Sequence, residues 1–573
     1  MHQISIIDFK ELGYRLQFTN PITELKTKIL ADIPKLMADV TAYQEKGYYV
    51  VGYLTYEAAK AFDPQFETYS KTLNNGYLAY FTVHDSYQQL DFPLSYQKTP
   101  LAQNWQTNIT EANYQKAIAQ IHHQMRYGNT YQVNFTIQLE QELDELNHLD
   151  LYNQLMVEQQ AGYNAYIAYD DVVILSASPE LFFKRLSQTL ITRPMKGTTK
   201  RGANLIQDKA EANWLANDAK NRSENMMIVD LLRNDMGKIC QTGSVKVTSL
   251  CQVEQYSTVW QMTSTIEGQL DKGTTLYHIF EALFPCGSIT GAPKQSTMSI
   301  ISQLEENPRG VYCGTIGILF PNGDAYFNVP IRTIQMNQNK ATYGVGGGIT
   351  WESKWHEEWQ EIKQKSAILY RQKPTFDLLT TAKVENQHIL FYAEHLNRLK
   401  EASHYFGYPF YEEKLKQLIT DHLSTLDSSD YRLSIKLNHQ GQISISSQTL
   451  VPLSEAFLTA KLKKQDKPIK DSPFTFFKTT YRPHLEKSNQ ETIYFDDDQF
   501  LLETSIGNLF LEIDNHLYTP PVDFGILPGI FRQSLLEKGI VIEKKLTLDD
   551  LKRAIRIFAG NAIRGLYQLT LDD

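Results

Sequence analysis

Two different series of short motifs meet near residue 372, and this junction constrains the fold more than any other feature of the sequence. One series, rich in glycine and charged residues, ends at residues 371–374, and another begins at residues 376–381. The chain has 573 residues, which is more than one hydrophobic core usually serves. We therefore predict two domains, residues 1–372 and residues 373–573.

Charge and cysteine usage narrow the class of protein. The formal net charge is −9, and no basic stripe is clustered along the chain, which argues against nucleic acid or an anionic membrane as a partner. The four cysteines stand singly, without the spacing of a zinc site or a disulfide framework. The first residues lack the pattern of a signal peptide, and no run of 18 apolar residues follows. We expect a cytoplasmic protein without nucleic-acid or membrane partners.

Periodicity and capping signals predict the main elements coarsely. Helices are expected over residues 110–128, 213–232 and 355–371, and strands over residues 48–53, 76–83 and 131–139. The lysine-rich stretch 461–470 is expected to be a solvated loop.

Lys196 lies in the turn sequence Pro-Met-Lys-Gly-Thr, at residues 194–198. A lysine next to a glycine turn is most often a solvated surface charge. The alternative is a desolvated amine that acts as a nucleophile. The surrounding motifs decide between the two interpretations.

Three acids suggest a site for a hard cation. Glu358 and Glu361 are three residues apart on a predicted helix, and Lys365 follows Glu361 by four, so all three side chains share one face. Glu224 lies on another predicted helix. Carboxylates from two helices suit Mg²⁺, whereas the plain alternative is exposed acids paired with nearby lysines.

Other residues suit an anionic ligand. The guanidinium of Arg332 can bind a carboxylate through bidentate hydrogen bonds, and Tyr312 can add a phenolic donor. Glycines 346–348 let backbone N–H groups approach an anion closely.

The motifs at residues 194–198, 288–294, 325–333 and 344–349 resemble those of the chorismate-utilising enzymes, a family that includes anthranilate, isochorismate and aminodeoxychorismate synthases. The resemblance spans about residues 45–370 and implies an α+β fold of antiparallel β-sheets packed with helices. It implies a catalytic role for Lys196 and metal binding by Glu224, Glu358 and Glu361. It assigns substrate binding to Ser288, Thr290, Tyr312, Arg332, Gly346, Gly347, Gly348 and Lys365.

Two positions distinguish among the members of this family. Anthranilate and isochorismate synthases carry alanine where Lys196 stands, and Gln261 stands where anthranilate synthases place a histidine, removing a general acid or base. The resemblance thus favours Mg²⁺-dependent amination of chorismate at C4, with anthranilate synthesis as the weaker alternative. No glutaminase segment is evident, so ammonia is expected from a separate glutamine amidotransferase subunit or from solution.

The second series resembles the fold-type IV enzymes that use pyridoxal 5′-phosphate (PLP), among them aminodeoxychorismate lyase and aminotransferases. Its motifs lie at residues 395–399, 478–482, 503–510, 525–530 and 561–565. The resemblance implies a PLP-dependent α/β domain in which Lys478 binds the cofactor covalently and Glu503 pairs with its ring nitrogen. It assigns phosphate binding to Arg398 and the turn of Leu527, Gly529 and Ile530, and the substrate side to Asn561 and Arg564.

Fusion of the two series favours a lyase over an aminotransferase, because a lyase would consume the product of the first domain. The resemblance then implies 4-aminobenzoate, a folate precursor, and pyruvate as products, and a homodimer formed through the PLP domain. Ala562 departs from the hydroxyl residue common in the last motif. A non-catalytic assembly module therefore stays an alternative for residues 373–573.

Overall fold

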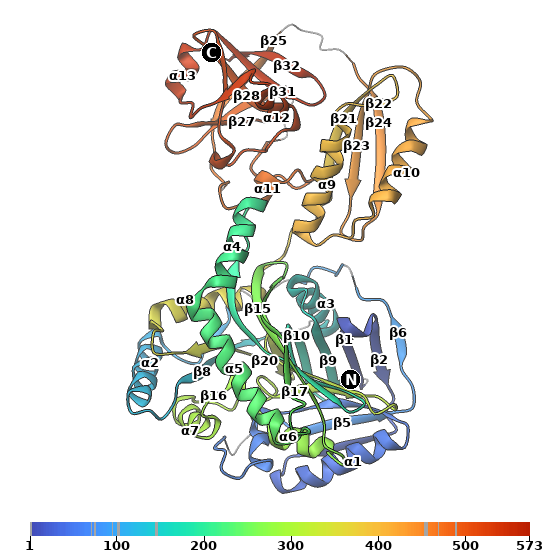
Figure 1. The fold of residues 1–573 in the computed structure, drawn as a ribbon, viewed down its shortest axis with the longest axis vertical. Helices are drawn as coiled ribbons and strands as arrows, with labels where there is room; N and C mark the ends of the chain where they lie inside the picture. Colours follow the sequence, from blue (N-terminus) through green and yellow to red (C-terminus); the bar gives the residue numbers. More distant parts are fainter. Residues whose placement is uncertain are drawn as a thin grey trace. The chain divides into compact units, whose positions relative to one another are not determined.

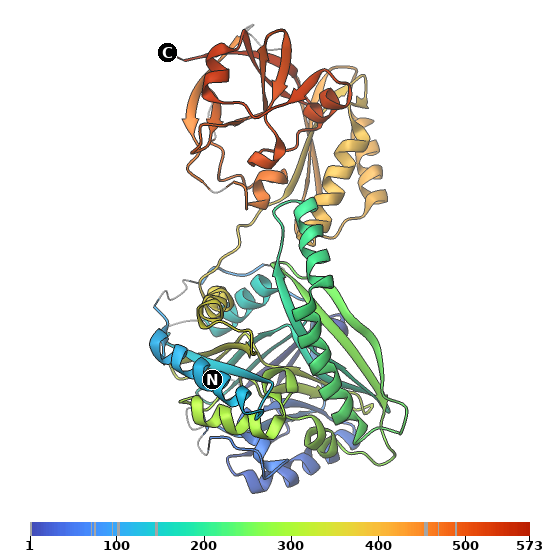
Figure 2. The ribbon, with the colours of Figure 1, turned by 60° about the vertical axis from the view of Figure 1, so that its left-hand side comes forward.

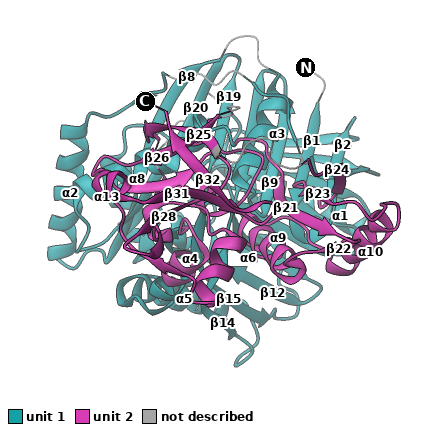
Figure 3. Ribbon diagram, turned by 90° about the horizontal axis from the view of Figure 1, so that it is seen from above, with its two compact units in different colours: residues 1–200, 212–373 teal, residues 201–211, 374–573 magenta. Residues whose placement is uncertain are grey.

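The computed structural model describes residues 3–69, 72–73, 76–93, 95–99, 104–143, 147–451, 457–467, 469–486 and 490–572. The chain divides into two compact units, one of residues 1–200 and 212–373 and one of residues 201–211 and 374–573 (Figure 3). The architecture confirms the predicted fold class, since the first unit is built on antiparallel sheets packed with helices. In the described part of the chain, no helix is both long and apolar enough to span a membrane.

Two antiparallel sheets form the first unit (Figure 1). The first sheet runs in the order β16 (Gly291–Ala292), β8 (Gln132–Glu142), β20 (Lys340–Ile349), β19 (Thr333–Asn337), β10 (Val172–Ser178), β9 (Tyr163–Tyr169), β1 (Ile4–Phe9), β2 (Arg15–Thr19) and β6 (Gln88–Leu90), with β7 (Gln106–Thr107) paired to β8. The second runs in the order β13 (Met195–Lys200), β15 (Val259–Gln269), β12 (Thr189–Arg193), β11 (Glu180–Leu186), β18 (Ala325–Val329), β17 (Thr315–Leu319), β4 (Tyr49–Leu54), β5 (Ala79–His84) and β3 (Thr23–Thr27), with β14 (Lys246–Gln255) paired to β15.

Alternation of side chains along the strands gives each sheet two apolar faces. The facing sides pack together through residues such as Ile7, Ile174 and Ile316. On the outer face of the first sheet lie α2 (Glu111–Arg126), α3 (His148–Gln159), α7 (Lys294–Leu304) and α8 (Trp355–Ser366). On the outer face of the second lie α1 (Ile33–Glu45), α5 (Ala219–Gly237) and α6 (Leu276–Leu283), as Figure 2 shows for α5. Short 3₁₀ turns η1 (Lys10–Leu12), η2 (Leu30–Asp32), η3 (Tyr56–Ala61), η5 (Gly287–Ile289) and η6 (Ala367–Leu369) connect these elements.

The predicted elements are confirmed in type, with one helix divided. The Thr110 hydroxyl accepts the backbone N–H of Asn113 at 3.2 Å and starts α2 where the cap was predicted. The helix expected over residues 213–232 is wrong as a single element: α4 (Leu205–Asn217) ends before Asp218, whose backbone is extended and whose carboxylate accepts the N–H of Asn221 at 2.9 Å to start α5. An N-cap inside the helical pattern therefore breaks it.

The second unit contains two sheets. One is antiparallel, in the order β22 (His388–Ile389), β21 (Leu378–Glu385), β23 (Tyr431–Leu437) and β24 (Ile443–Thr449), with α9 (Tyr392–Phe406) and α10 (Glu412–Leu423) on one face. The other is mixed, in the order β27 (Leu501–Thr504), β26 (Glu491–Phe495), β25 (Phe457–Lys464), β32 (Gly565–Leu571), β31 (Arg556–Asn561), β28 (Asn508–Ile513), β29 (His516–Thr519) and β30 (Val541–Glu543). Since β27 also pairs with β28, six of these strands close into a ring. Helices α11 (Pro473–Phe476), α12 (Ile530–Glu537) and α13 (Leu548–Arg553) and the turn η7 (Val522–Phe524) complete the unit.

The solvated loop predicted over residues 461–470 is wrong for its first part. Residues 461–464 belong to β25, which pairs in parallel with β26 and β32. Alternation explains the error, because Ala460 is buried in the core while Lys461 and Lys463 pair with the exposed carboxylate of Glu486. Lys464, at the end of the strand, lies on the other face and pairs with Asp497 at 2.8 Å. A lysine-rich sequence can therefore form a strand when its charges reach acidic partners at the surface.

A short segment of residues 201–211, which includes the start of α4, is built into the second unit. The Arg201 guanidinium donates to both carboxyl oxygens of Asp208 at 2.7 Å and stacks 4.5 Å from the ring centre of Tyr405. The Tyr405 hydroxyl donates to the carbonyl of Gly202 at 2.8 Å. Ala203 packs in the core of this unit beside Leu399.

Candidate active sites

Lys196 lies on β13, in the first unit, with its amine directed into a polar pocket. Its Nζ donates to the carbonyl oxygen of Ser288 at 2.8 Å. Burial lowers the pKa of the Lys196 amine, and the nearby carboxylates of Glu180 and Glu224 only partly oppose that shift. A larger neutral fraction makes this amine a better nucleophile than an exposed lysine.

The turn that carries Lys196 is held by Gln261 of β15. The Gln261 Nε2 donates to the carbonyl of Gly197 at 2.8 Å, and its Oε1 accepts the Thr198 hydroxyl at 2.8 Å. Gly197 has φ +87°, and a Cβ there would also lie 3.0 Å from Asn221 Oδ1. The glutamine therefore fixes the geometry of the lysine turn without offering a titratable group.

Glu180, at the start of β11, is a site residue that the sequence motifs did not single out. Its side chain is only 3% exposed, and one carboxyl oxygen has no hydrogen-bond partner among the described residues. Burial raises the pKa of Glu180, while Ser288 and Lys196 oppose the shift. An acid directly before the apolar run Leu-Phe-Phe was the available signal, because buried acids are rare unless paired. The charges of Glu180 and Lys196 influence each other's pKa values, which places this acid in the environment of the amine.

Glycine 348 on β20 approaches Lys196 closely. A Cβ at Gly348 would lie 3.3 Å from Lys196 Nζ and 2.1 Å from Gln132 Nε2. No side chain fits there without displacing the Gln132 amide. The structure thus brings Gly348 and Lys196, 152 positions apart in the numbering, into one site.

Gly346 and Gly347, on the same strand, border the acidic helix α8. The Lys365 Nζ donates to the carbonyl of Gly346 at 2.7 Å. A Cβ at Gly347 would lie 3.2 Å from Glu358 Oε2 and 3.5 Å from Lys365 Nζ. An absent side chain at Gly347 therefore leaves room for a ligand between the strand and the helix.

The three predicted metal-binding acids influence one another. Burial raises the pKa values of Glu224 and Glu358, and the charge of Glu361 adds to both shifts. Glu361 itself is paired with Lys365 at 2.7 Å, which lowers its pKa. Within the described ranges, no group of three or more acidic, histidine or cysteine side chains has metal-holding geometry. Mg²⁺ usually takes one or two carboxylates together with water and ligand oxygens, so the donor chemistry fits this ion.

The remaining predicted substrate residues border the same region. The Arg332 Nη1 donates to the carbonyl of Lys365 at 2.6 Å, and φ at Arg332 is +55°. The hydroxyl of Thr290 donates to the carbonyl of Cys286 at 3.1 Å, two residues before Ser288. Tyr312 is buried, with its ring where a Cβ at residue 344 would be.

Lys478 follows α11, in the second unit. Its backbone carbonyl accepts the N–H of Leu379 at 2.9 Å. Burial, together with the nearby cations Arg398, Arg482 and Arg432, lowers the pKa of the Lys478 amine to about 7. Half of this amine is therefore neutral near physiological pH and able to attack a carbonyl carbon.

The predicted phosphate-binding residues converge on one turn. The Arg398 Nη2, on α9, donates to the carbonyl of Pro528 at 2.7 Å. The Asn508 Nδ2 donates to the carbonyl of Leu527 at 2.8 Å, and a Cβ at Gly529 would lie 1.9 Å from Asn508 Oδ1. Helix α12 begins at Ile530, and its free N–H groups complete a site that suits a phosphate.

Glu503 lies at this turn on β27, only 4% exposed. One of its oxygens accepts the backbone N–H of Leu527 at 3.3 Å, and the other lies 3.3 Å from Arg482 Nη2. Asn561 uses its side-chain oxygen to accept the N–H groups of Ile563 and Arg564, both at 3.0 Å, which shapes the last motif into a turn. Lysine, acid and phosphate-binding turn together fit PLP.

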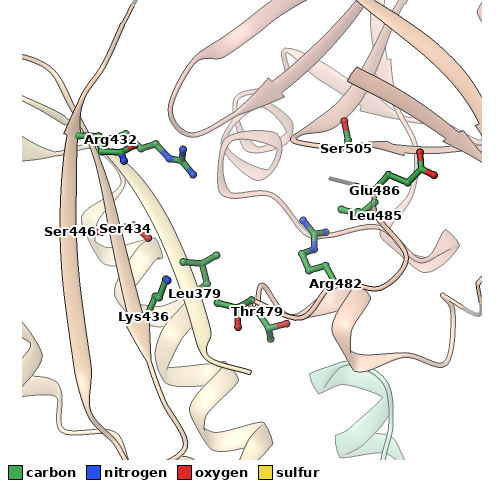
Figure 4. A pocket seen from close by; sticks show the side chains of 12 residues that line it. Leu379, Arg432, Ser434, Lys436, Ser446, Thr479, Arg482, Leu485, Glu486 and Ser505 are labelled. Atoms are coloured by element: carbon green, nitrogen blue, oxygen red, sulfur yellow. The ribbon is translucent and has the colours of Figure 1, made fainter. Parts of the chain in front are cut away.

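A cavity of about 550 Å³ is lined in part by Thr479 and Thr480, which follow Lys478 in the sequence (Figure 4). Alternation along β23 sends Leu433, Ile435 and Leu437 into the core and leaves the residues between them on the opposite face. Arg432, Lys436 and Arg482 line the cavity, with Glu486 as an acidic member. The excess of cations suits a ligand that carries carboxylates.

Comparisons with known proteins identify the family of enzymes to which this fold and the Lys196 site belong. The family model described as chorismate binding enzyme matches residues 8–371, and the chain belongs to this family. The model described as amino-transferase class IV matches residues 377–571, so the two are fused in one chain.

Curated relatives of the first region include two aminodeoxychorismate synthases. Aminodeoxychorismate synthase component 1 of Bacillus subtilis is 36% identical over 274 residues, covering 48% of this chain and 58% of the relative. The protein of the same name from Escherichia coli is 36% identical, with 48% and 60% covered. The chain thus spans somewhat more than half the length of these relatives.

A solved structure supports the fold of the first unit. Anthranilate synthase component I from Streptococcus pneumoniae TIGR4 superposes with a TM-score of 0.55 at 23% identity, covering 64% of this chain and 92% of that one.

Proposed function

We propose that the first unit aminates chorismate at C4 to give 4-amino-4-deoxychorismate. The observation that carries this proposal is the partly desolvated amine of Lys196 at Gly348, within a site of the chorismate binding enzyme family. The names of the relatives support it, since aminodeoxychorismate synthases recur among them.

In the proposed reaction the neutral Lys196 amine adds to C2 of the ring, both conjugated ring double bonds shift by one position toward C4, and the C4–O bond breaks so that the hydroxyl group leaves. Glu180, whose pKa is raised by burial, is the acid proposed to donate the proton that lets the hydroxyl leave as water. Ammonia then adds at C4, both double bonds shift back, and the C2–N bond breaks, which restores the diene of the ring and the free Lys196 amine. Every bond formed to the lysine is thus broken within one turnover.

The proposed roles of the other residues follow from their positions. Arg332 and Lys365 hold substrate carboxylates, with Tyr312, Ser288, Thr290 and Gly346–Gly348 lining the pocket. Glu224, Glu361 and Glu358 would hold Mg²⁺, which when bound stabilises negative charge on the ring carboxylate. Ammonia is proposed to come from a separate glutamine amidotransferase subunit.

For the second unit we propose elimination of pyruvate from that product, which gives 4-aminobenzoate for folate synthesis. PLP, when bound, supplies an electron sink for this step. Arg398 and the turn of Leu527, Gly529 and Ile530 hold its phosphate, Glu503 faces its ring nitrogen, and Lys478 moves the proton at the reacting carbon. Arg432 and Lys436 bind the substrate carboxylates on the side of Asn561 and Arg564. The cationic cavity supports a dicarboxylate substrate, and a homodimer through this unit remains part of the proposal.

Product analysis tests both halves at once. The purified chain is incubated with chorismate, Mg²⁺, ammonium and PLP, and products are identified by mass spectrometry. We expect 4-aminobenzoate and pyruvate in equal amounts. Formation of 2-aminobenzoate would instead make the first unit an anthranilate synthase, and accumulation of 4-amino-4-deoxychorismate would leave the second unit as an assembly module.

A further inference from the structure

His484 is a buried histidine whose ring makes no hydrogen bond. The side chain is 3% exposed, and neither ring nitrogen has a hydrogen-bond partner among the described residues. Buried polar groups are almost always bonded, because an unpaired one costs roughly 1–3 kcal/mol. Such a group inside a site needs a ligand-related explanation.

The nearest polar partner of this ring is Glu503. His484 Nε2 lies 3.7 Å from Glu503 Oε1, on the side opposite the oxygen that accepts the N–H of Leu527. The backbone of His484 is fixed, because its carbonyl accepts the Gln465 Nε2 at 3.0 Å. A small rotation of either side chain closes the gap to a hydrogen bond.

The other charged groups around Glu503 do not replace this contact. Arg482 lies 3.3 Å from the same carboxyl oxygen but also lines the cavity, where a substrate carboxylate competes for it. Lys478 and Tyr494 interact with Glu503 through their charges, without a hydrogen bond to it among the described residues. His484 is therefore the buried donor that no substrate can draw away.

We propose that His484 is a positioning residue that donates a hydrogen bond from Nε2 to Glu503 and keeps this carboxylate aimed at the ring nitrogen of the cofactor. This inference rests on the proposed function of the second unit. A held carboxylate keeps the ring nitrogen protonated, and a protonated ring is the better electron sink. His484 thus acts on the cofactor only through Glu503.

Two substitutions separate this role from simple packing. His484→Gln retains an N–H donor near the Nε2 position, whereas His484→Leu fills a similar space without a donor. The matched control is His516→Leu, at an exposed histidine that contacts the carbonyl of Asp514 in its own turn. The measurements are the Kd of the apoenzyme for PLP and the absorbance of bound PLP as a function of pH.

We expect His484→Leu to weaken PLP binding about tenfold, the effect of one lost hydrogen bond to a charged group. We also expect the pKa of the cofactor's ring nitrogen, measured as the pH midpoint of its absorbance change, to move downward, because a displaced carboxylate stabilises the protonated ring less well. His484→Gln is expected to restore both to within about threefold of the parent protein. The inference is overturned if the Leu variant has the same Kd and pH midpoint as the parent and the control. It is also overturned if the Gln variant is as impaired as the Leu variant.

Failure of the proposed function has a different signature. If the parent chain binds no PLP, or if borohydride does not attach PLP to Lys478, then both the function and this inference fall. If PLP attaches to Lys478 but the His484 variants match the parent, only the role of His484 is wrong. If the Leu variant does not fold, His484→Phe takes its place, because it keeps an aromatic ring of similar size without a donor: a weakened Kd in the Phe variant that the Gln variant restores supports the role of the donor, and a Phe variant equal to the parent contradicts it.

Discussion

At the scale of single residues, the proposed chemistry depends on two lysine amines whose pKa values lie below that of an ordinary lysine. Burial lowers the pKa of Lys196, and burial with neighbouring cations lowers that of Lys478. Both residues were predicted from their motifs, because a lysine nucleophile is tied to a short local sequence. Glu180 and His484 were not, because their roles depend on strands and turns that meet only in the folded chain.

Lys196→Ala tests the nucleophile directly. We expect amination to fall at least about 100-fold, while the midpoint of thermal unfolding stays unchanged, because only the amine is removed from a preformed pocket. Lys200→Ala, at the exposed end of the same strand, is the matched control and should keep full activity. Turnover of the Lys196 variant within a few-fold of the parent would contradict covalent catalysis.

The pH dependence of PLP attachment tests the environment of Lys478. The neutral amine attacks, so attachment to the apoenzyme should rise with pH and reach half its maximum rate near the pKa of about 7. Arg432→Gln removes a cation that disfavours the protonated amine, so the midpoint should move to higher pH. Stopped-flow absorbance measures the rate of attachment. An unchanged pH midpoint in the Arg432 variant would show that the charge of Arg432 does not affect the pKa of the Lys478 amine.

At the scale of elements, the sequence predicted helices and strands where the periodicity was uninterrupted. α2 and β8 lie where they were expected, since a cap and a glycine bounded the helix. The divided helix at Asp218 and the strand at residues 457–464 were missed, because one depends on a local cap within a continuous pattern and the other on pairing with distant strands. Close approach of Gly348 to Lys196 likewise depends on sheet packing.

Gly348→Ala tests the approach of β20 to the lysine. The added methyl group would lie 2.1 Å from the Gln132 amide and 3.3 Å from Lys196 Nζ, so the pocket should narrow. We expect amination to fall about tenfold or more, through a misplaced amine rather than unfolding. Gly162→Ala, where nothing lies within 4 Å of the new Cβ, is the control, and equal rates for the two variants would make Gly348 a structural glycine.

At the scale of the whole molecule, the second unit includes a segment from the middle of the sequence. Residues 201–211 contribute the Arg201–Asp208 pair and Ala203 to it. We expect the fragment 374–573 to unfold at a lower temperature than the second unit within the full chain, because Tyr405 loses its partner and apolar surface is exposed. Calorimetry of both proteins checks this, and equal unfolding temperatures would mean that the segment is dispensable.

The two sites are each built from residues of one unit only, which makes their defects separable. Lys196→Ala should stop the first reaction and Lys478→Ala the second, the latter causing 4-amino-4-deoxychorismate to accumulate, because each change leaves the other site complete. A mixture of the two variants should therefore form 4-aminobenzoate, after a lag while the intermediate builds up in solution. Chromatography of the products over time measures this, with each variant alone as the control. If the mixture stays inactive while the Lys478 variant accumulates the intermediate, the second unit does not accept that compound from solution. A Lys478 variant that still forms 4-aminobenzoate at the parent rate would show that the second unit is not the lyase.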